Sequence, residues 1–217
     1  MRGLEVKPKV LINLSPENFE QDWKRAAAAM NRALEIASHT GADGFGVFEQ
    51  KWLPGFGLLP VLGALRAYIE DNRLGEEARR DLRRWYWCSV FLERYSSAVE
   101  SKARRDYQDM IALWNGSEMK PIPFVDADIR IGSAAYSVRD SASTASSVYS
   151  GVFCLLAQNG ARDWSAVEEI TLQNLQDHHI FPRDFLMRHG LQSRSDKSNM
   201  NSITNRTLIS GRTNQII

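Results

Sequence analysis

The first part of the chain repeats apolar residues with the period of an α-helix. One stripe recurs at steps of three and four residues: Phe19, Trp23, Ala26, Met30, Leu34 and Ala37. This spacing places the stripe on one face of a helix. Ser15 and Pro16 supply a capping hydroxyl and then a proline whose missing N–H costs nothing at a helix start. The pattern predicts a helix that begins near Ser15 and ends before Gly41.

Further helices are expected from the same apolar period. They lie at about Pro60 to Asp71, Glu76 to Val99, Ser101 to Trp114 and Val148 to Leu156. Before the last of these, Pro121 and Pro123 each remove a backbone donor and restrict the residue that precedes them, so an irregular segment is expected there. Residues 1–165 are therefore predicted to form a helical domain.

The pattern becomes extended toward the C-terminus. Residues 170–175 predict a strand that leads into His178, and residues 203–209 predict a second strand. Ser210-Gly211 then turns the chain, and the residues after it begin a helix. The expected fold is mainly α, with a small strand, loop, strand and helix module over residues 166–217 following the helical domain.

The composition is that of an ordinary globular protein, with 43% hydrophobic and 24% charged residues among 217. No apolar run approaches the ~18 residues of a membrane span. The segment from Met1 to Leu14 lacks the order of a signal peptide. Cys88 and Cys154 lie far apart in helical patterns and are expected as small buried hydrophobes in a reducing compartment. Together these features predict a cytoplasmic protein with no membrane partner.

The net charge is only +1, so any surface for nucleic acid must be local. Residues 171–217 carry a basic excess in which Arg183, Arg188, Arg194, Lys197, Arg206 and Arg212 stand against Asp177, Asp184 and Asp196. Charge alone favours a solvated face here. The excess gains meaning because it surrounds the pair formed by His178 and His179.

The candidate chemistry is concentrated in one stretch and two later carboxamides. Asp177-His178-His179-Ile180-Phe181-Pro182 holds two of the four histidines beside a carboxylate, and Asn205 and Asn214 follow nine residues apart. Such groups can hold one divalent metal ion and activate one water. Alone, Asn205 would be read as a turn residue and Asn214 as a helix cap. In this order, within a strand–turn–helix setting, the residues predict a metal-dependent site.

The order His-His-Ile-x-Pro, Asn and a later Asn resembles the His-Asn-His nucleases of the ββα-metal class. A narrower resemblance rests on Trp85-Tyr86-Trp87, Arg94-Tyr95-Ser96 and the segment from Gly160 to Trp164. These are similar to the C-terminal half of phage-defence proteins of the GmrSD and SspE kind. That resemblance implies an N-terminal nucleotide-hydrolysing sensor half, whose Asp-Gly-Gln-Gln-Arg signature does not occur in this sequence. A fragment or a separately made nuclease half, with the sensor as partner, is therefore expected.

The resemblance also implies a role for each residue of the motif. His179 is the general base, His178 and Asn214 are metal ligands, and Asn205 ties the loop and helps to aim the base. The expected cofactor is one divalent ion, Mg²⁺ or Mn²⁺, and an imidazole ligand would also suit Zn²⁺ or Ni²⁺. The expected products are 5′-phosphate and 3′-hydroxyl ends.

Alternatives remain open at this point for the metal ligand and for the function. Asp177 and His179 point the same way on a regular strand, so Asp177 is a second candidate for the metal ligand, or else it orients an imidazole. Arg183, Arg206 and Arg212 are expected to contact DNA phosphates. The predicted function is DNA cleavage or nicking in the restriction of phage or foreign DNA. The alternatives are a non-catalytic helical module that binds DNA or a partner with a degenerate metal site, and a nuclease for RNA.

Overall fold

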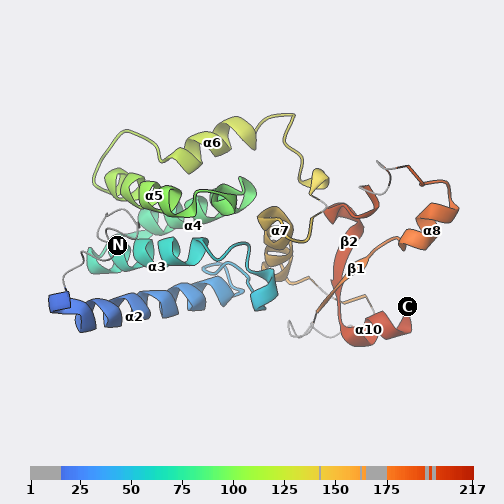
Figure 1. Cartoon of the computed structure of the whole chain (residues 1–217), viewed down its shortest axis with the longest axis horizontal. Coiled ribbons are helices and arrows are strands. Elements are labelled where there is room, and N and C mark those ends of the chain that lie inside the picture. The colour runs from blue at the N-terminus through green and yellow to red at the C-terminus, as the bar shows by residue number, and fades with distance from the viewer. Residues whose placement is uncertain (1–15, 142, 162, 165–174, 194–195, 197–198) are drawn as a thin grey trace. The chain divides into compact units, whose positions relative to one another are not determined.

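The computed structural model describes residues 16–141, 143–161, 163–164, 175–193, 196 and 199–217. The chain forms two compact units (Figure 1). The first comprises Met1–Ile36 with Gly55–Ser133, and the second comprises Ala37–Pro54 with Ala134–Ile217. Within the described residues, none of the helices is long and apolar enough to span a membrane.

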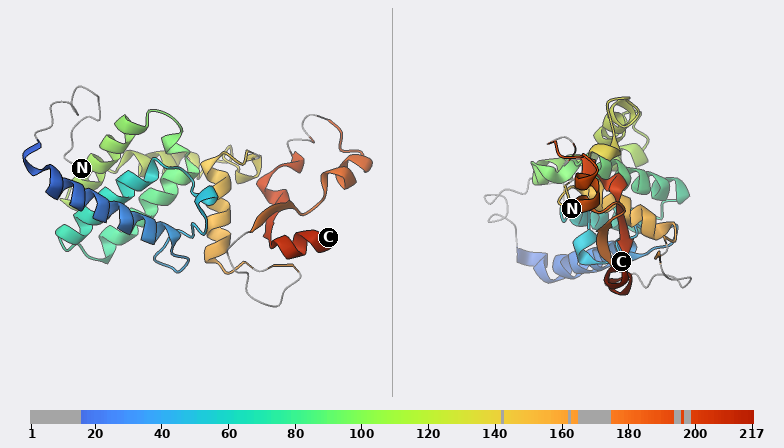
Figure 2. Two further views of the ribbon diagram at one scale, coloured as in Figure 1. Left: turned by 60° about the horizontal axis from the view of Figure 1, so that its bottom comes forward. Right: turned by 90° about the vertical axis from the view of Figure 1, so that its right-hand side faces the viewer.

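The first unit is helical. Its elements are α2 (Phe19–Ser38, whose last two residues belong to the second unit), α3 (Leu58–Asp71), α4 (Glu76–Phe91), α5 (Val99–Trp114) and α6 (Ile122–Arg130). Helix α3 packs against α4 and α5, and α6 packs against α4. Figure 2 shows the ribbon from two further sides. At Gly63 of α3, a Cβ would lie 2.8 Å from the Ala29 carbonyl oxygen, so the absent side chain lets α2 approach α3 closely. The prediction of a mainly helical protein is confirmed.

The helix expected from Glu76 to Val99 is interrupted, and this prediction was wrong in its second half. Helix α4 ends at Phe91, and Glu93 and Ala98 both adopt left-handed backbone conformations with φ near 50°. The interruption turns Arg94 into the interior, where only 8% of its side chain is exposed. The pattern of apolar residues does not reveal this interruption, because the interruption serves a buried polar contact.

That contact is a cluster around Asp106 of α5, which is completely buried. Its carboxylate accepts hydrogen bonds from Arg94 Nε at 2.7 and 2.9 Å, from the Tyr95 hydroxyl at 2.6 Å and from Trp85 Nε1 at 3.2 Å. Burial and the neighbouring Asp106 raise the pKa of Tyr95, which stays neutral and donates its proton. Such a buried carboxylate is tolerated because its charge is paired with Arg94 and its oxygens accept hydrogen bonds from all three neighbours.

A second correction concerns the segment expected to be irregular around Pro121 and Pro123. Helix α6 begins there, with Pro121 just before its first residue and Pro123 in its first turn. The first turn of a helix has no intrahelical acceptor for its N–H groups, so proline is compatible with it. The prolines therefore start a helix here.

The second unit places a helix beside a small sheet. Its elements are α7 (Ser147–Gln158), β1 (Gln176–His179), α8 (Arg183–Arg188), β2 (Arg206–Ile209) and α10 (Gly211–Ile216). In its interior, Phe153 of α7 meets the ring of Trp52 edge-on at 4.8 Å. At its surface, Lys51 Nζ donates to the Leu175 carbonyl at 2.9 Å, just before β1. Cys88 of the first unit and Cys154 of the second are buried free thiols, as expected.

The two strands form one antiparallel pair with a regular register. Gln176 lies opposite Ile209, and His179 lies opposite Arg206. The order strand, loop, strand and helix was expected, although the expected strand residues 170–174 lie outside the described part of the chain. The predicted module of residues 166–217 lies within a larger compact unit, which also contains α7 and residues 37–54. That these residues form a separate module stays a prediction.

Replacement of Asp106 by alanine should strongly destabilise the first unit, because Arg94 would keep a buried charge without its partner. We expect the free energy of unfolding to fall by about 3–5 kcal/mol, measured by urea denaturation followed by circular dichroism. Asp71→Ala serves as the control. Its carboxylate pairs with Arg25 at 2.8 Å but is 58% exposed, so the loss should stay below about 1 kcal/mol. Equal losses in the two variants would contradict the structural role of the Asp106 cluster.

Candidate active site

The regular pairing of β1 and β2 gives the sheet two chemically different faces. Side chains alternate along a strand, and residues directly opposite each other share a face. The His179 face therefore consists of Asp177, His179, Arg206 and Leu208. The His178 face consists of Gln176, His178, Thr207 and Ile209. The two adjacent histidines thus point to opposite sides of the strand.

On the His179 face, one carboxamide fixes the imidazole. Nε2 of His179 lies 3.1 Å from Oδ1 of Asn201, and Nη2 of Arg206 donates to the same oxygen at 3.3 Å. A guanidinium can only donate, so this atom of Asn201 is the amide oxygen and an acceptor. His179 therefore donates from Nε2, and the tautomer assigned from these partners leaves the lone pair on Nδ1.

An ion pair with Asp177 holds Arg206 in position. Nη1 of Arg206 donates to Oδ2 of Asp177 at 3.2 Å, and the hydroxyl of Tyr149 in α7 donates to the same oxygen at 2.5 Å. Burial, followed by the hydrogen bond to Asp177, raises the pKa of Tyr149, so it stays a neutral donor. Arg206 and Asp177 expose only 13% and 19% of their side chains. The pair therefore holds the guanidinium in place against Asn201.

The surroundings of His179 favour its neutral form. Burial lowers the pKa of His179 below its ordinary value, and the positive charges of Arg206 and Arg183 act in the same direction. The hydrogen bond to Asn201 and the charge of Asp177 oppose this but do not reverse it. At neutral pH the imidazole is consequently uncharged and able to accept a proton.

Asn205 holds the turn that follows His179. Its Oδ1 accepts from the Phe181 N–H at 2.9 Å, and its Nδ2 donates to the carbonyls of Phe181 at 3.2 Å and Met200 at 2.8 Å. Its own carbonyl accepts from the Ile180 N–H at 2.9 Å. The residue is 9% exposed. Three of these hydrogen bonds fix the backbone directly after His179, and the fourth ties Asn205 to Met200.

The His178 face carries the second asparagine. Nδ2 of Asn214 in α10 donates to Oε1 of Gln176 at 2.6 Å, which places the carboxamide on the face that His178 shares with Gln176. The ring of His178 meets Trp164 edge-on, with the centroids 6.1 Å apart. His178 and Asn214 are therefore brought to the same face, whereas His179 lies on the other.

Helix α10 is anchored by a buried carboxylate. Oδ2 of Asp163 accepts from the Ser210 N–H at 3.0 Å, and Ser210 Oγ accepts from the Thr213 N–H at 3.1 Å. Burial pushes the pKa of Asp163 upward, but the hydrogen bonds from Ser210 and Thr213 outweigh it and hold the pKa below its usual value. A carboxylate at a helix N-terminus also complements the helix dipole. Asp163 thus orients the helix that carries Asn214.

The arginines predicted to contact DNA occupy different environments. Arg206 is engaged by Asp177 and Asn201, whereas Arg183 of α8 and Arg212 of α10 are exposed.

Three residues that complete the site were not predicted: Tyr149, Asp163 and Asn201. Tyr149 lies within the helix expected from Val148 to Leu156 and was given no role, and Asp163 lay within the segment that carried the resemblance without a role of its own. No local pattern marks Asn201, because its partner His179 lies 22 residues away.

The predicted metal ligands, His178 and Asn214, do not belong to a larger cluster of ligating side chains in the described part of the chain. Among the described residues, no three histidine, cysteine, aspartate or glutamate side chains gather where they could hold a metal ion together.

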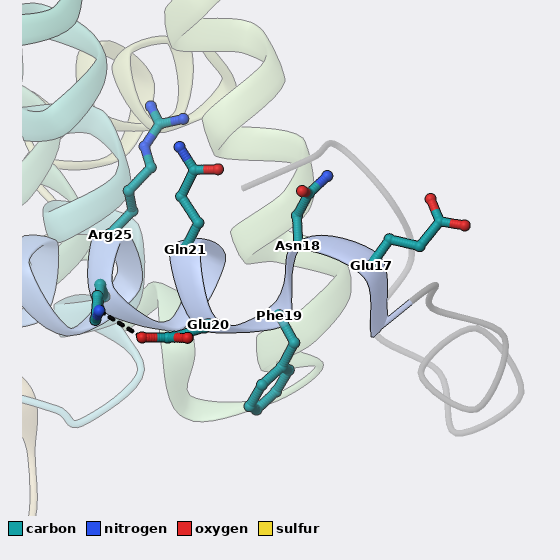
Figure 3. A pocket seen from close by; sticks show the side chains of 7 residues that line it. Glu17, Asn18, Phe19, Glu20, Gln21 and Arg25 are labelled. Atoms are coloured by element: carbon teal, nitrogen blue, oxygen red, sulfur yellow. Dashed lines mark hydrogen bonds and ion pairs between the residues drawn. The ribbon is translucent and has the colours of Figure 1, made fainter.

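A separate open pocket borders the start of α2 in the first unit (Figure 3). Glu17, Gln21 and Arg25 help to line it, and none of the predicted site residues does.

Comparisons with known proteins leave the function open. No family model matches the chain, and no solved structure matches it significantly. The chain is 28% identical over 222 residues to the uncharacterized protein MJ0686 of Methanocaldococcus jannaschii. The match covers 100% of this chain and 36% of that protein, so the chain spans little more than a third of the relative's length.

The His179 geometry predicts how its ring titrates. We expect Nδ1 to be the nitrogen that gains a proton, with a pKa below the ordinary imidazole value of about 6.5. A series of long-range ¹H–¹⁵N spectra recorded against pH should show Nε2 protonated throughout. His179→Gln identifies the resonance. A ring protonated at Nδ1 in its neutral form, or a pKa above the ordinary value, would contradict the arrangement described here.

Proposed function

We propose that the second unit is a metal-dependent DNA endonuclease in which His179 activates the attacking water. The observation that carries the proposal is the state of this imidazole. Its Nε2 is engaged by Asn201, its pKa is lowered, and the turn behind it is fixed by Asn205. A general base needs a defined lone pair and a neutral form at working pH, and both conditions are met.

The proposed proton path begins at His179. Nδ1 accepts a proton from the water as the water attacks the phosphorus and the bond from phosphorus to the 3′ oxygen breaks. The leaving 3′ oxygen takes a proton from solvent, and the imidazolium keeps its Nε2–H bond to Asn201 until it returns its Nδ1 proton to solvent. Arg206 and Asp177 form a compensated pair, so neither transfers a proton. Arg206 is therefore proposed to position Asn201, while the exposed Arg183 and Arg212 are proposed to contact phosphates.

The donor chemistry of the His178 face fits a divalent ion that retains water or phosphate ligands. His178 supplies an imidazole nitrogen and Asn214 a carboxamide oxygen, and both are neutral. When bound, a divalent cation supplies positive charge to the scissile phosphate as negative charge develops there. Mg²⁺ and Mn²⁺ are the proposed ions, and an imidazole ligand also admits Zn²⁺ or Ni²⁺.

Asp177 is the weaker candidate for the ligand. Its charge is already compensated by Arg206, and Oδ2 accepts two hydrogen bonds. Its Oδ1 is buried without a hydrogen-bond partner in the described part of the chain. A cation would have to open this packing to reach that oxygen. Asp177 is therefore proposed to position Arg206 rather than to hold the metal.

The proposed biological role is restriction of phage or foreign DNA in the cytoplasm. The longer length of the archaeal relative agrees with a module that works beside further chain or a partner subunit. Recognition of the invading DNA would then belong to a nucleotide-hydrolysing sensor half. A non-catalytic DNA- or partner-binding module remains the competing function, and the small number of metal ligands is the observation that favours it.

Loss of the base should remove cleavage without loss of folding. We expect His179→Ala to lower the rate of plasmid nicking by roughly 10²–10⁴-fold in Mg²⁺ or Mn²⁺. The control is His39→Ala, because His39 is an exposed histidine whose Nδ1 accepts from the nearby Gly41 N–H. Chelator should stop the wild-type reaction. Nicking by His179→Ala at the wild-type rate would sink the assignment, and preferential cleavage of RNA would correct the substrate.

The ligand assignment predicts separate effects on metal dependence and turnover. His178→Ala and Asn214→Ala should each raise the Mn²⁺ concentration that gives half-maximal nicking by on the order of tenfold or more. Asp177→Asn should lower the rate at saturating Mn²⁺ while leaving that half-maximal concentration nearly unchanged. The reverse pattern, with only Asp177→Asn shifting the Mn²⁺ requirement, would transfer the ligand role to Asp177.

A further inference from the structure

The segment that follows His179 exposes an unusual amount of apolar surface. Helix α8 contains no buried residue. Four large apolar side chains of the segment are exposed: Ile180 by 38%, Phe181 by 56%, Phe185 by 48% and Met187 by 37%. Apolar surface gathered over eight residues requires an explanation, whereas single exposed apolar residues do not.

Phe181 combines a fixed backbone with an exposed ring. Both its N–H and its carbonyl are held by the carboxamide of Asn205, at 2.9 and 3.2 Å. A buried side chain therefore secures the main chain of a residue whose own side chain faces outward. This arrangement presents the ring in a defined position, two residues after His179, without using it for the core.

The charges around this ring match a polyanion. Arg183 and Arg188 are exposed on α8, where Asp184 is the acidic residue. The ring of Phe185 lies against His189, with the centroids 4.1 Å apart. Apolar side chains flanked by arginines are the combination with which proteins enter a DNA groove and part neighbouring base pairs. Two exposed arginines against one aspartate give the helix a net positive charge, which complements the phosphates of a nucleic acid.

We propose that residues 180–189 dock on duplex DNA and that Phe181 wedges between stacked base pairs beside the cleaved phosphate. The inference rests on the proposed nuclease function and adds how the substrate is gripped. Wedging costs least where stacking is weak, so pyrimidine–purine steps and mismatched or bulged duplexes are the preferred substrates. The selectivity would come from deformability of the DNA and not from contacts to base edges.

Binding tests the wedge without the need for cleavage. The protein carrying His179→Ala is mixed with duplexes that contain one 2-aminopurine at a pyrimidine–purine step, and fluorescence reports unstacking. We expect a rise in fluorescence on binding. Addition of Phe181→Ala should abolish the rise and weaken binding by about tenfold, whereas Phe181→Trp should retain both. Phe56→Ala, which removes a ring that is 67% exposed in the first unit, should change neither.

The outcomes separate this surface from the nuclease proposal. Unstacking by the His179→Ala protein, combined with a wild-type protein that cuts no nucleic acid, would support the wedge and overturn only the enzyme. Unchanged affinity and fluorescence after Phe181→Ala would overturn the wedge even if the wild type cuts DNA. Loss of self-association in Phe181→Ala during sedimentation, with DNA binding intact, would show instead that the surface joins copies of the chain and would likewise overturn it.

Discussion

The antiparallel register of β1 and β2 is the constraint on which the site depends. It places His179 opposite Arg206, and the period of two then assigns every neighbour to a face. A slip of one residue would exchange the two histidines between the faces and separate Arg206 from Asp177. The register therefore decides which side chains meet at the site. Asn205 extends this control by fixing the backbone just beyond the strand end.

A buried or half-buried aspartate that accepts from an arginine and a tyrosine occurs in both units, with different consequences. In the first unit, Asp106 accepts from an arginine, a tyrosine and a tryptophan and is completely enclosed. In the second, Asp177 accepts from an arginine and a tyrosine, but Arg206 also reaches Asn201 and through it His179. The enclosed cluster can only stabilise the fold. The Asp177 cluster is connected through Arg206 and Asn201 to His179, and it thereby fixes the position of a titratable ring.

Sequence periodicity was sufficient where packing is apolar and local. It located α2, α3, α5 and α7 and the order of strands and helix near the C-terminus, because each follows from one stripe or one turn. It failed at Glu93, where the chain leaves the helix to bring Arg94 to Asp106, and at Pro121, where proline starts a helix. Tyr149 and Asn201 were missed for a related reason. Their partners lie 28 and 22 residues away, so no local pattern marks them.

The opposed faces of the strand also limit where a phosphate could sit. His178 and His179 point to different sides, so one phosphate group can approach both only past the end of β1, where the alternation stops and the chain turns. That position lies next to the Phe181 backbone held by Asn205. A duplex that brings its backbone there would meet the exposed ring and the arginines of α8 at the same time. Under the proposed function, the two-faced strand would take its substrate at the strand end, where the turn exposes apolar and basic side chains together.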